Sequence, residues 1–174
     1  TREGLVVHSG DFKFDTAPLD GEPPDFAKLA EFGGQDPILL LSDCTNVERP
    51  GFAGSEAQVG EVFERIFANA HGRMFVTCFA SHIARIEQVF QHSARTGRRV
   101  AVAGRSMTRN IQTAVRLGYL DIPPGTEIPA DVVNELAPHE VTLLAAGSQG
   151  EPFSALTRIS IGGHKWLQAR TGAA

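Results

Sequence analysis

The stretch VAVAGRSM (100–107) contains the pattern that decides the fold of this chain of 174 residues. A short apolar run, 100–103, is followed at once by Gly104, Arg105 and Ser106, and a helical period starts near Met107. The run does not alternate apolar with polar residues, which is typical of a strand covered on both faces in a parallel sheet. The stretch therefore predicts a strand, a polar turn and a helix in succession.

The same pattern recurs along the chain. Further apolar runs lie at 38–41, 74–79 and 141–146, and stripes of apolar residues at helical spacing cover 59–70, 83–94 and 107–117. Shorter helices are expected near 131–136 and after Pro152. Alternation of strands and helices with short loops predicts an α/β fold, with a doubly wound, mostly parallel sheet flanked by helices, as in Rossmann-like domains.

Composition limits the classes of function. The net charge of −4 argues against binding nucleic acid by bulk positive charge, although a local anion site remains compatible with it. Cys44 and Cys78 are too few and too far apart for a disulfide framework or a zinc knuckle, and we expect both to be reduced and buried. No apolar stretch has membrane-spanning length and no signal-peptide pattern is visible. These features predict a cytoplasmic protein without a membrane partner.

Polar residues follow each apolar run. In an open parallel sheet the carboxyl ends of the strands share one edge, where ligands bind, and helix N-termini at that edge favour phosphate or carboxylate. An arginine there adds a bidentate donor. The four turns 42–46, 80–82, 104–106 and 147–151 are therefore expected to form one anion-binding edge. The candidate phosphate ligands are Ser81, His82, Arg105, Ser106, Ser148, Gln149 and Gly150.

Each of these residues also has a simpler interpretation. Ser81 and Ser106 each precede a predicted helix, where serine is most often an N-cap. His82 taken alone is more often a surface histidine than a ligand. The loop Gly147–Gly150 lacks the Gly-Lys-Ser/Thr ending of a P-loop.

Two acids follow predicted strands, namely Asp11 in HSGDFKFD (8–15) and Asp43 in the turn 42–46. Each is either a turn residue, Asp43 as an Asx turn and Asp11 beside the flexible Gly10, or a functional acid. As a functional acid, Asp11 is a metal ligand or a catalytic acid, and Asp43 orients a ligand or a metal-bound histidine. No His-x-His, His-Glu-x-x-His or Cys-x-x-Cys spacing occurs, so local sequence does not build a complete metal site.

Six stretches in order resemble one family, ribonuclease J, in the β-CASP branch of the metallo-β-lactamase superfamily. They are HSGDFKFD (8–15), DGEPPD (20–25), LLSDCTNVERPGF (40–52), FASHI (79–83), GRSM (104–107) and GSQGEP (147–152). The resemblance implies a β-CASP domain inserted into a metallo-β-lactamase domain. Residues 16–37 are rich in Pro, Gly and Asp and lie outside the alternation of strands and helices, which indicates a connector. The resemblance assigns 1–15 to a piece of the hydrolase domain and 38–174 to the β-CASP domain.

The resemblance also implies an activity, namely endonucleolytic and 5′-to-3′ exonucleolytic hydrolysis of RNA by two divalent metal ions, usually zinc. Asp11 matches the carboxylate that bridges the metals, and Asp43 matches an acid close to a metal-binding histidine. Both count as catalytic candidates. Ser81, His82 and the loop around Ser148 match the region that meets the 5′ phosphate of the RNA. The family also implies a homo-oligomer.

The family's His-x-His-x-Asp-His cluster is not found in the chain. We therefore expect a piece of a larger ribonuclease that is inactive alone, and the tail ARTGAA (169–174) is consistent with this expectation. Two alternatives remain open. One is a nucleotide- or RNA-binding α/β module without catalysis. The other is an assembly role, in which apolar surface left exposed drives association.

Overall fold

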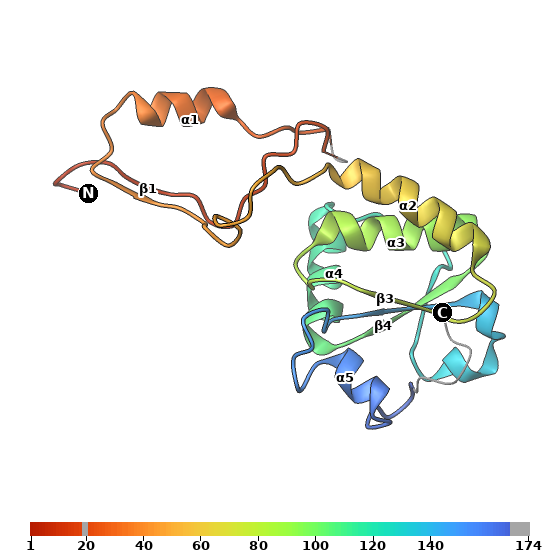
Figure 1. Ribbon diagram of the computed structural model, residues 1–174. Helices are drawn as coiled ribbons and strands as arrows, with labels where there is room; N and C mark the ends of the chain where they lie inside the picture. Colours follow the sequence, from red (N-terminus) through yellow and green to blue (C-terminus); the bar gives the residue numbers. More distant parts are fainter. Residues whose placement is uncertain (19–20, 168–174) are drawn as a thin grey trace. The chain divides into compact units, whose positions relative to one another are not determined.

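The computed structural model describes residues 1–18 and 21–167, and it divides into two compact units (Figure 1). Unit 1 is Thr1–Gln58 and unit 2 is Val59–Ala174. The predicted domain limit at residue 38 differs from this division. The assignment of 1–15 and 38–174 to two parent domains stays a prediction, and the expectation about the tail 169–174 lies outside the described residues.

Unit 1 contains a small parallel ladder. Strand β1 (Val6–His8) pairs with β2 (Leu39–Leu41) in the register Val6↔Leu39 and His8↔Leu41. Helix α1 (Phe26–Gly33) lies between them in sequence and begins at Asp25, whose carboxylate accepts a hydrogen bond from Lys28 N. The expected connector 16–37 thus contains a helix, which the glycines, prolines and acids around it obscured.

The prediction that residues 38–41 form a strand is confirmed, but the prediction that they join the main sheet is wrong. All three residues of β2 are exposed, and their ladder partner is β1. An apolar run specifies a strand, whereas the choice of neighbouring strand depends on chain segments far away in sequence. The turn 42–46 therefore does not belong to the edge that the other three turns form.

The remaining elements are those of an alternating α/β fold. In chain order they are α2 (Glu56–Asn69), β3 (Met74–Thr77), α3 (Ile83–Arg95), β4 (Arg99–Ala103), α4 (Arg105–Leu117), β5 (Glu127–Ile128), the 3-10 turns η1 (Val132–Glu135) and η2 (Pro138–Glu140), β6 (Val141–Ala145) and α5 (Ala155–Ser160). The helix α2 starts in the last residues of unit 1 and continues into unit 2. The predicted helices are all present, with 131–136 forming a 3-10 turn rather than an α-helix.

The sheet of unit 2 has four strands in the order β3-β6-β4-β5, and every pairing is parallel. Thr77, Ala145 and Ala103 are aligned at the carboxyl ends of β3, β6 and β4. The predicted parallel α/β architecture is confirmed for this unit. Because the strand ends are aligned, the turns that follow them leave the sheet side by side.

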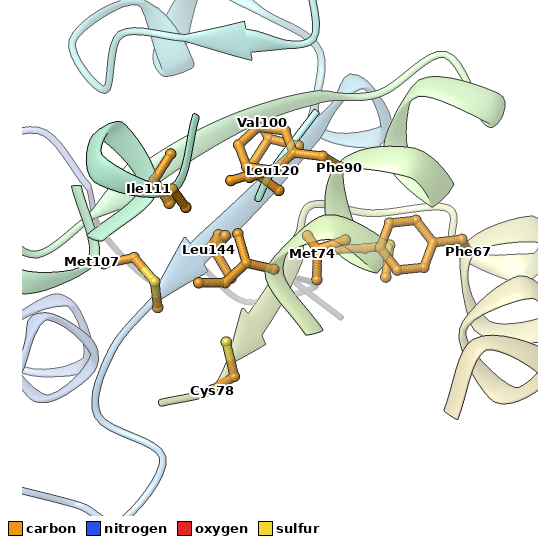
Figure 2. Packing of buried hydrophobic residues seen from close by; sticks show 12 residues of the cluster. Phe67, Met74, Cys78, Phe90, Val100, Met107, Ile111, Leu120 and Leu144 are labelled. Carbon is orange, nitrogen blue, oxygen red and sulfur yellow. The ribbon is translucent and has the colours of Figure 1, made fainter. Parts of the chain in front are cut away.

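Two hydrophobic clusters cover the two faces of this sheet. Helices α2, α3 and α4 pack on one face, where Phe90, Met107 and Leu144 are completely buried (Figure 2). The other face packs against α5, η1 and Leu167, and Leu143 lies in that cluster. Leu143 and Leu144 point to opposite faces because side chains alternate along a strand. Figure 1 shows α3 and α5 on opposite sides of β3 and β4.

The two cysteines differ in environment. Cys78 is buried directly after β3, and burial raises the pKa of its thiol to about 11, so it remains an unreactive thiol at neutral pH. Cys44 is exposed, contrary to the expectation that both would be buried. Across the described residues, no helix combines the length and apolar character that crossing a membrane requires.

Candidate functional site

The first group of candidate residues lies at the carboxyl end of the unit 1 ladder. The parallel pairing of β1 with β2 places the turns 9–12 and 42–45 next to each other. Ser9 N donates to Leu41 O at 2.9 Å, and Asp43 N donates to Ser9 Oγ at 3.0 Å. Asp11 and Asp43 were predicted from separate stretches, and the structure places them in adjoining turns.

Asp43 is held in an Asx turn. Its Oδ1 accepts hydrogen bonds from Thr45 Oγ1 at 2.6 Å and from Thr45 N at 3.0 Å. The Thr45 hydroxyl, followed by its backbone N–H and those of Phe12 and Cys44, lowers the pKa of Asp43. The turn interpretation of Asp43 is therefore confirmed. The same contacts fix an ionised carboxylate beside the turn that carries Asp11.

Asp11 itself is exposed, and the described residues offer its carboxylate no hydrogen bond or ion pair. Within residues 1–18 and 21–167, no group of three or more His, Cys, Asp and Glu side chains is arranged to hold a metal ion. A divalent metal needs several ligands, and Asp11 supplies one. The residues present thus do not form a metal site by themselves, and the bridging role of Asp11 stays a prediction.

Sequence reasoning missed Asp15, which is the buried acid of the stretch HSGDFKFD. Its carboxylate accepts hydrogen bonds from Glu56 N at 2.9 Å, Ser55 Oγ at 3.1 Å and Ala17 N at 3.0 Å. The Glu56 N–H is the main cause of the lowered pKa of Asp15. Asp15 therefore binds the first turn of α2, 41 residues along the chain, a separation that no local pattern reveals.

The second group lies along the carboxyl edge of unit 2, which we define as the turns 78–82, 104–106 and 146–151 after β3, β4 and β6. These strands are adjacent and aligned, so three of the four predicted turns share an edge. Asn110 on α4 donates to Ala80 O at 2.8 Å and holds the turn after β3 against that helix. Seven candidate residues lie in these three turns, namely Ser81, His82, Arg105, Ser106, Ser148, Gln149 and Gly150.

The helix N-termini at the carboxyl edge differ in how they are capped. Nδ1 of His82 accepts a hydrogen bond from Arg85 N at 3.3 Å, so His82 is the N-cap of α3. Gly104 is the N-cap of α4 and provides no side-chain acceptor. The simpler prediction, that Ser81 and Ser106 are N-caps, is therefore wrong. Ser81 precedes the cap, and Ser106 lies inside the first turn of α4.

The start of α4 has the features of an anion site. Without a side-chain cap, the first N–H groups of a helix are available to a negatively charged ligand, which the helix dipole also favours. Arg105 and Ser106 are exposed at this point, and Ser148, Gln149 and Gly150 are exposed on the neighbouring turn. Chemically, the edge offers backbone N–H groups, hydroxyls and a guanidinium, which together suit a phosphate.

Two glycines with positive φ lie in these turns. Gly104 has φ +115°, and a Cβ there would lie 3.5 Å from Ala155 Cβ, at the start of α5. Gly147 has φ +122°, and a Cβ there would overlap the side chain of Ser154. A larger residue at Gly147 would displace Ser154 at the start of α5, whereas at Gly104 the positive φ, and not a lack of space, favours glycine.

Comparison with known proteins gives a consistent result. Residues 71–174 match the family model described as Ribonuclease J, beta-CASP domain. The chain is 42% identical over 169 residues to Ribonuclease J of Thermus thermophilus, covering 97% of this chain and 29% of that protein. It is 44% identical over 169 residues to Ribonuclease J of Synechocystis, covering 97% and 26%.

A third relative, Ribonuclease J of Mycobacterium tuberculosis, is 41% identical over 172 residues, covering 99% of this chain and 31% of that protein. The chain thus spans between about a quarter and a third of the length of the curated relatives that it matches. The similarity extends over both units, whereas the family model covers most of unit 2.

Proposed function

The chain belongs to the ribonuclease J family, and on this premise we propose that it is part of a metal-dependent ribonuclease that hydrolyses RNA phosphodiesters. Its contribution is to bind RNA through the 5′ phosphate and to provide one metal-bridging carboxylate. The full protein acts as both endonuclease and 5′-to-3′ exonuclease, and it works in the cytoplasm as a homo-oligomer.

The carboxyl edge of unit 2 is the observation that carries this proposal. Three turns from adjacent parallel strands converge on the uncapped start of α4, with Arg105 beside it. The net charge of −4 means that affinity for RNA must come from local contacts of this kind rather than from overall charge. A terminal 5′ monophosphate carries more negative charge than an internal phosphodiester, so such a site selects RNA ends.

Each residue of the edge has a defined part in this binding. Arg105 donates two N–H groups to phosphate oxygens, and Ser81, Ser106 and Ser148 donate hydroxyl hydrogens. Gln149 and Gly150 add amide donors from the neighbouring turn. His82 holds the start of α3 through Nδ1 and contacts the RNA through the rest of its ring.

Asp11 and Asp43 have different parts in the proposal. Asp11, exposed after β1, offers a bridging ligand, and Asp43 orients a metal-binding histidine of the parent protein through its ionised carboxylate. When bound, two divalent metal ions, most suitably zinc, supply an activated water and stabilise the departing oxygen. Because the described residues offer the metals no ligand group beyond this carboxylate, the chain alone is expected to bind RNA without cleaving it.

Binding of end-labelled RNA tests the phosphate site. The chain is titrated against a ten-nucleotide RNA with a 5′ monophosphate and against the same RNA with a 5′ hydroxyl. We expect a clear preference for the phosphate and a loss of that preference in Ser81→Ala and Arg105→Ala. Ser160→Ala, an exposed serine at the end of α5, is the matched control. Equal affinity for both RNAs would contradict the proposed site.

A non-catalytic RNA- or nucleotide-binding module is the second candidate, and it would use the same carboxyl edge of unit 2. Two measurements separate the candidates. The gene sequence around this segment either encodes a His-x-His-x-Asp-His cluster or does not. In the longer protein, Asp11→Ala abolishes metal-dependent cleavage if the chain is part of a nuclease, and sedimentation of that protein tests the homo-oligomer.

A further inference from the structure

The loop between β6 and α5 is built as two successive turns. Gly150 N donates to Gly147 O at 3.1 Å, and Ser154 N donates to Glu151 O at 3.0 Å. Each hydrogen bond closes a four-residue turn whose ends lie within about 7 Å of each other. Residues 148–153 therefore form a short, ordered loop at the carboxyl edge.

The base of this loop is held firmly. Gly147 packs so closely on Ser154 that no larger residue fits, and Leu156 N donates to Ala146 O at 3.2 Å. Ser154 Oγ accepts from Thr157 N at 3.2 Å and caps α5, while Thr157 Oγ1 donates to Glu151 O at 2.9 Å. The backbone on either side of Phe153 is thus fixed by hydrogen bonds.

Phe153 projects from this ordered loop into solvent. Its side chain is 92% exposed, which is more than any other large hydrophobic side chain in the described part of unit 2. No aromatic contact among the described residues involves its ring. A single exposed phenylalanine is ordinary in itself, so its position and its fixed backbone carry the argument.

The position of Phe153 is next to the candidate phosphate ligands. It follows Gly150 by three residues and lies in the turn directly after the one that carries Ser148 and Gln149. A nucleotide whose phosphate is bound at 148–150 therefore has its base within reach of the ring. Proteins that hold single-stranded nucleic acid combine phosphate contacts with exposed aromatic rings on which bases stack.

We propose that Phe153 stacks on a base within the first few nucleotides behind the 5′ phosphate of single-stranded RNA. This inference rests on the proposed function, since it extends the phosphate site at 148–150 by a second contact. Stacking accepts every base, so Phe153 raises affinity without selecting a sequence. It also requires an unpaired 5′ end, because a base within a duplex does not present its face.

The test measures binding of a ten-nucleotide, 5′-monophosphorylated single-stranded RNA by fluorescence anisotropy. Phe153→Ala is expected to weaken binding about tenfold, as for the loss of one base–aromatic stack, and Phe153→Trp retains it. Tyr119→Ala is the matched control. Tyr119 is 74% exposed and follows the far end of α4, about 20 Å from the carboxyl edge at 1.5 Å per helical residue.

A second RNA makes the test specific for stacking. It carries abasic sugars at its first three positions and keeps all phosphates. If Phe153 stacks on a base, Phe153→Ala has no further effect on this RNA. An equal loss on both RNAs shows that the substitution disturbs the loop, and that result overturns the inference.

The remaining outcomes also decide between the proposals. If the unchanged chain prefers 5′-phosphorylated RNA and Phe153→Ala binds it equally well, the stacking inference is wrong and the phosphate site stands. If the unchanged chain binds neither the 5′-phosphorylated RNA nor the 5′-hydroxyl RNA, both the phosphate site and the stacking inference fail. If Phe153→Ala leaves RNA binding intact but abolishes self-association in sedimentation, the ring contacts protein instead, which also overturns the inference.

Discussion

Units 1 and 2 hold their candidate functional residues in place by different interactions. In the described residues, every buried hydrophobic side chain lies at Phe67 or later, so unit 2 has a hydrophobic core and unit 1 has none. Unit 1 is held by a ladder of three residue pairs and by the hydrogen bonds of Asp15 and Asp43. Two-stranded ladders are marginal in water without further packing.

The two candidate sites therefore differ in what holds their residues in place. The turns of the carboxyl edge of unit 2 follow strands of a sheet that is packed on both faces, so contacts within this chain set their geometry. The turns that carry Asp11 and Asp43 stand on exposed strands, and Leu40 on β2 is 62% exposed. Apolar surface of this kind is stabilised when another protein surface covers it. The proposed bridging role of Asp11 therefore depends on ligands that the described residues do not supply.

Separating the two units would test this contrast most strongly. We expect residues 55–174 to unfold cooperatively on heating and residues 1–58 to show no cooperative transition, because only the first piece contains a core. Circular dichroism melting curves of both pieces and of the full chain measure this. A sharp transition in residues 1–58 would show that unit 1 folds without a core, and the contrast would be lost.

Matched phenylalanine substitutions sharpen the contrast. Phe90 on α3 is fully buried, and Phe90→Ala is expected to lower the free energy of unfolding by about 3–5 kcal/mol through lost burial and a cavity. Phe26 on α1 is 48% exposed, and Phe26→Ala is expected to cost less than about 1 kcal/mol. Urea denaturation of both variants provides the comparison. Similar losses in the two variants would contradict it.

Two basic residues, one in each unit, provide a comparison with a smaller expected loss in the free energy of unfolding. Arg98 is buried and donates to the carbonyl oxygens of Gly72 and Val141 at 3.0 and 3.2 Å, and also to that of Ala70. Arg98→Ala leaves these carbonyls without their partner and is expected to cost about 2–3 kcal/mol in urea unfolding.

The matching residue in unit 1 is Lys13, which forms a surface ion pair with Glu56 at 2.9 Å. Lys13→Ala is expected to cost less than about 1 kcal/mol, because solvent screens such a pair. An Arg98→Ala variant as stable as Lys13→Ala would show that the buried guanidinium is dispensable.

The pH dependence of stability gives the smallest expected effect. Burial, assisted by Arg95, lowers the pKa of His92, so the unfolded chain binds a proton more readily than the folded chain. Unit 2 therefore loses stability as the pH falls below about 6.5, the ordinary value for histidine, and gains none above it. The pKa values of Asp15 and Asp43 in unit 1 are lowered, so the stability that they contribute is complete at neutral pH and begins to be lost only as the pH falls below about 4, the ordinary value for aspartate.

Urea midpoints at pH 7.5 and 5.5 measure this effect. His92 contacts the rings of Phe63 and Phe67, and His92→Phe is expected to reduce the difference between the two midpoints. His71→Gln changes an exposed histidine and is the control. If His92→Phe shows the same difference between its urea midpoints at pH 7.5 and 5.5 as the unchanged chain, other groups cause the pH dependence.

Most of unit 2 follows from local sequence patterns. Runs such as 100–103 and 141–146, followed by glycine turns and helical stripes, specify the strands, the helices and the parallel sheet, because these patterns involve residues close together in the chain. For the same reason, the residues of the carboxyl edge were predicted from their places after the strands. The Asx turn of Asp43 is also a local pattern.

Local patterns do not predict which segments contact each other. The tertiary structure pairs β2 with β1 instead of the main sheet, makes His82 rather than Ser81 the cap of α3, and buries Asp15 against the start of α2. Each outcome depends on where a strand finds its partner or how a turn packs. The pairing of β2 and the burial of Asp15 are set by contacts between residues distant in sequence, and the cap of α3 is set by the backbone geometry of the turn before it, so periodicity carries no information about them.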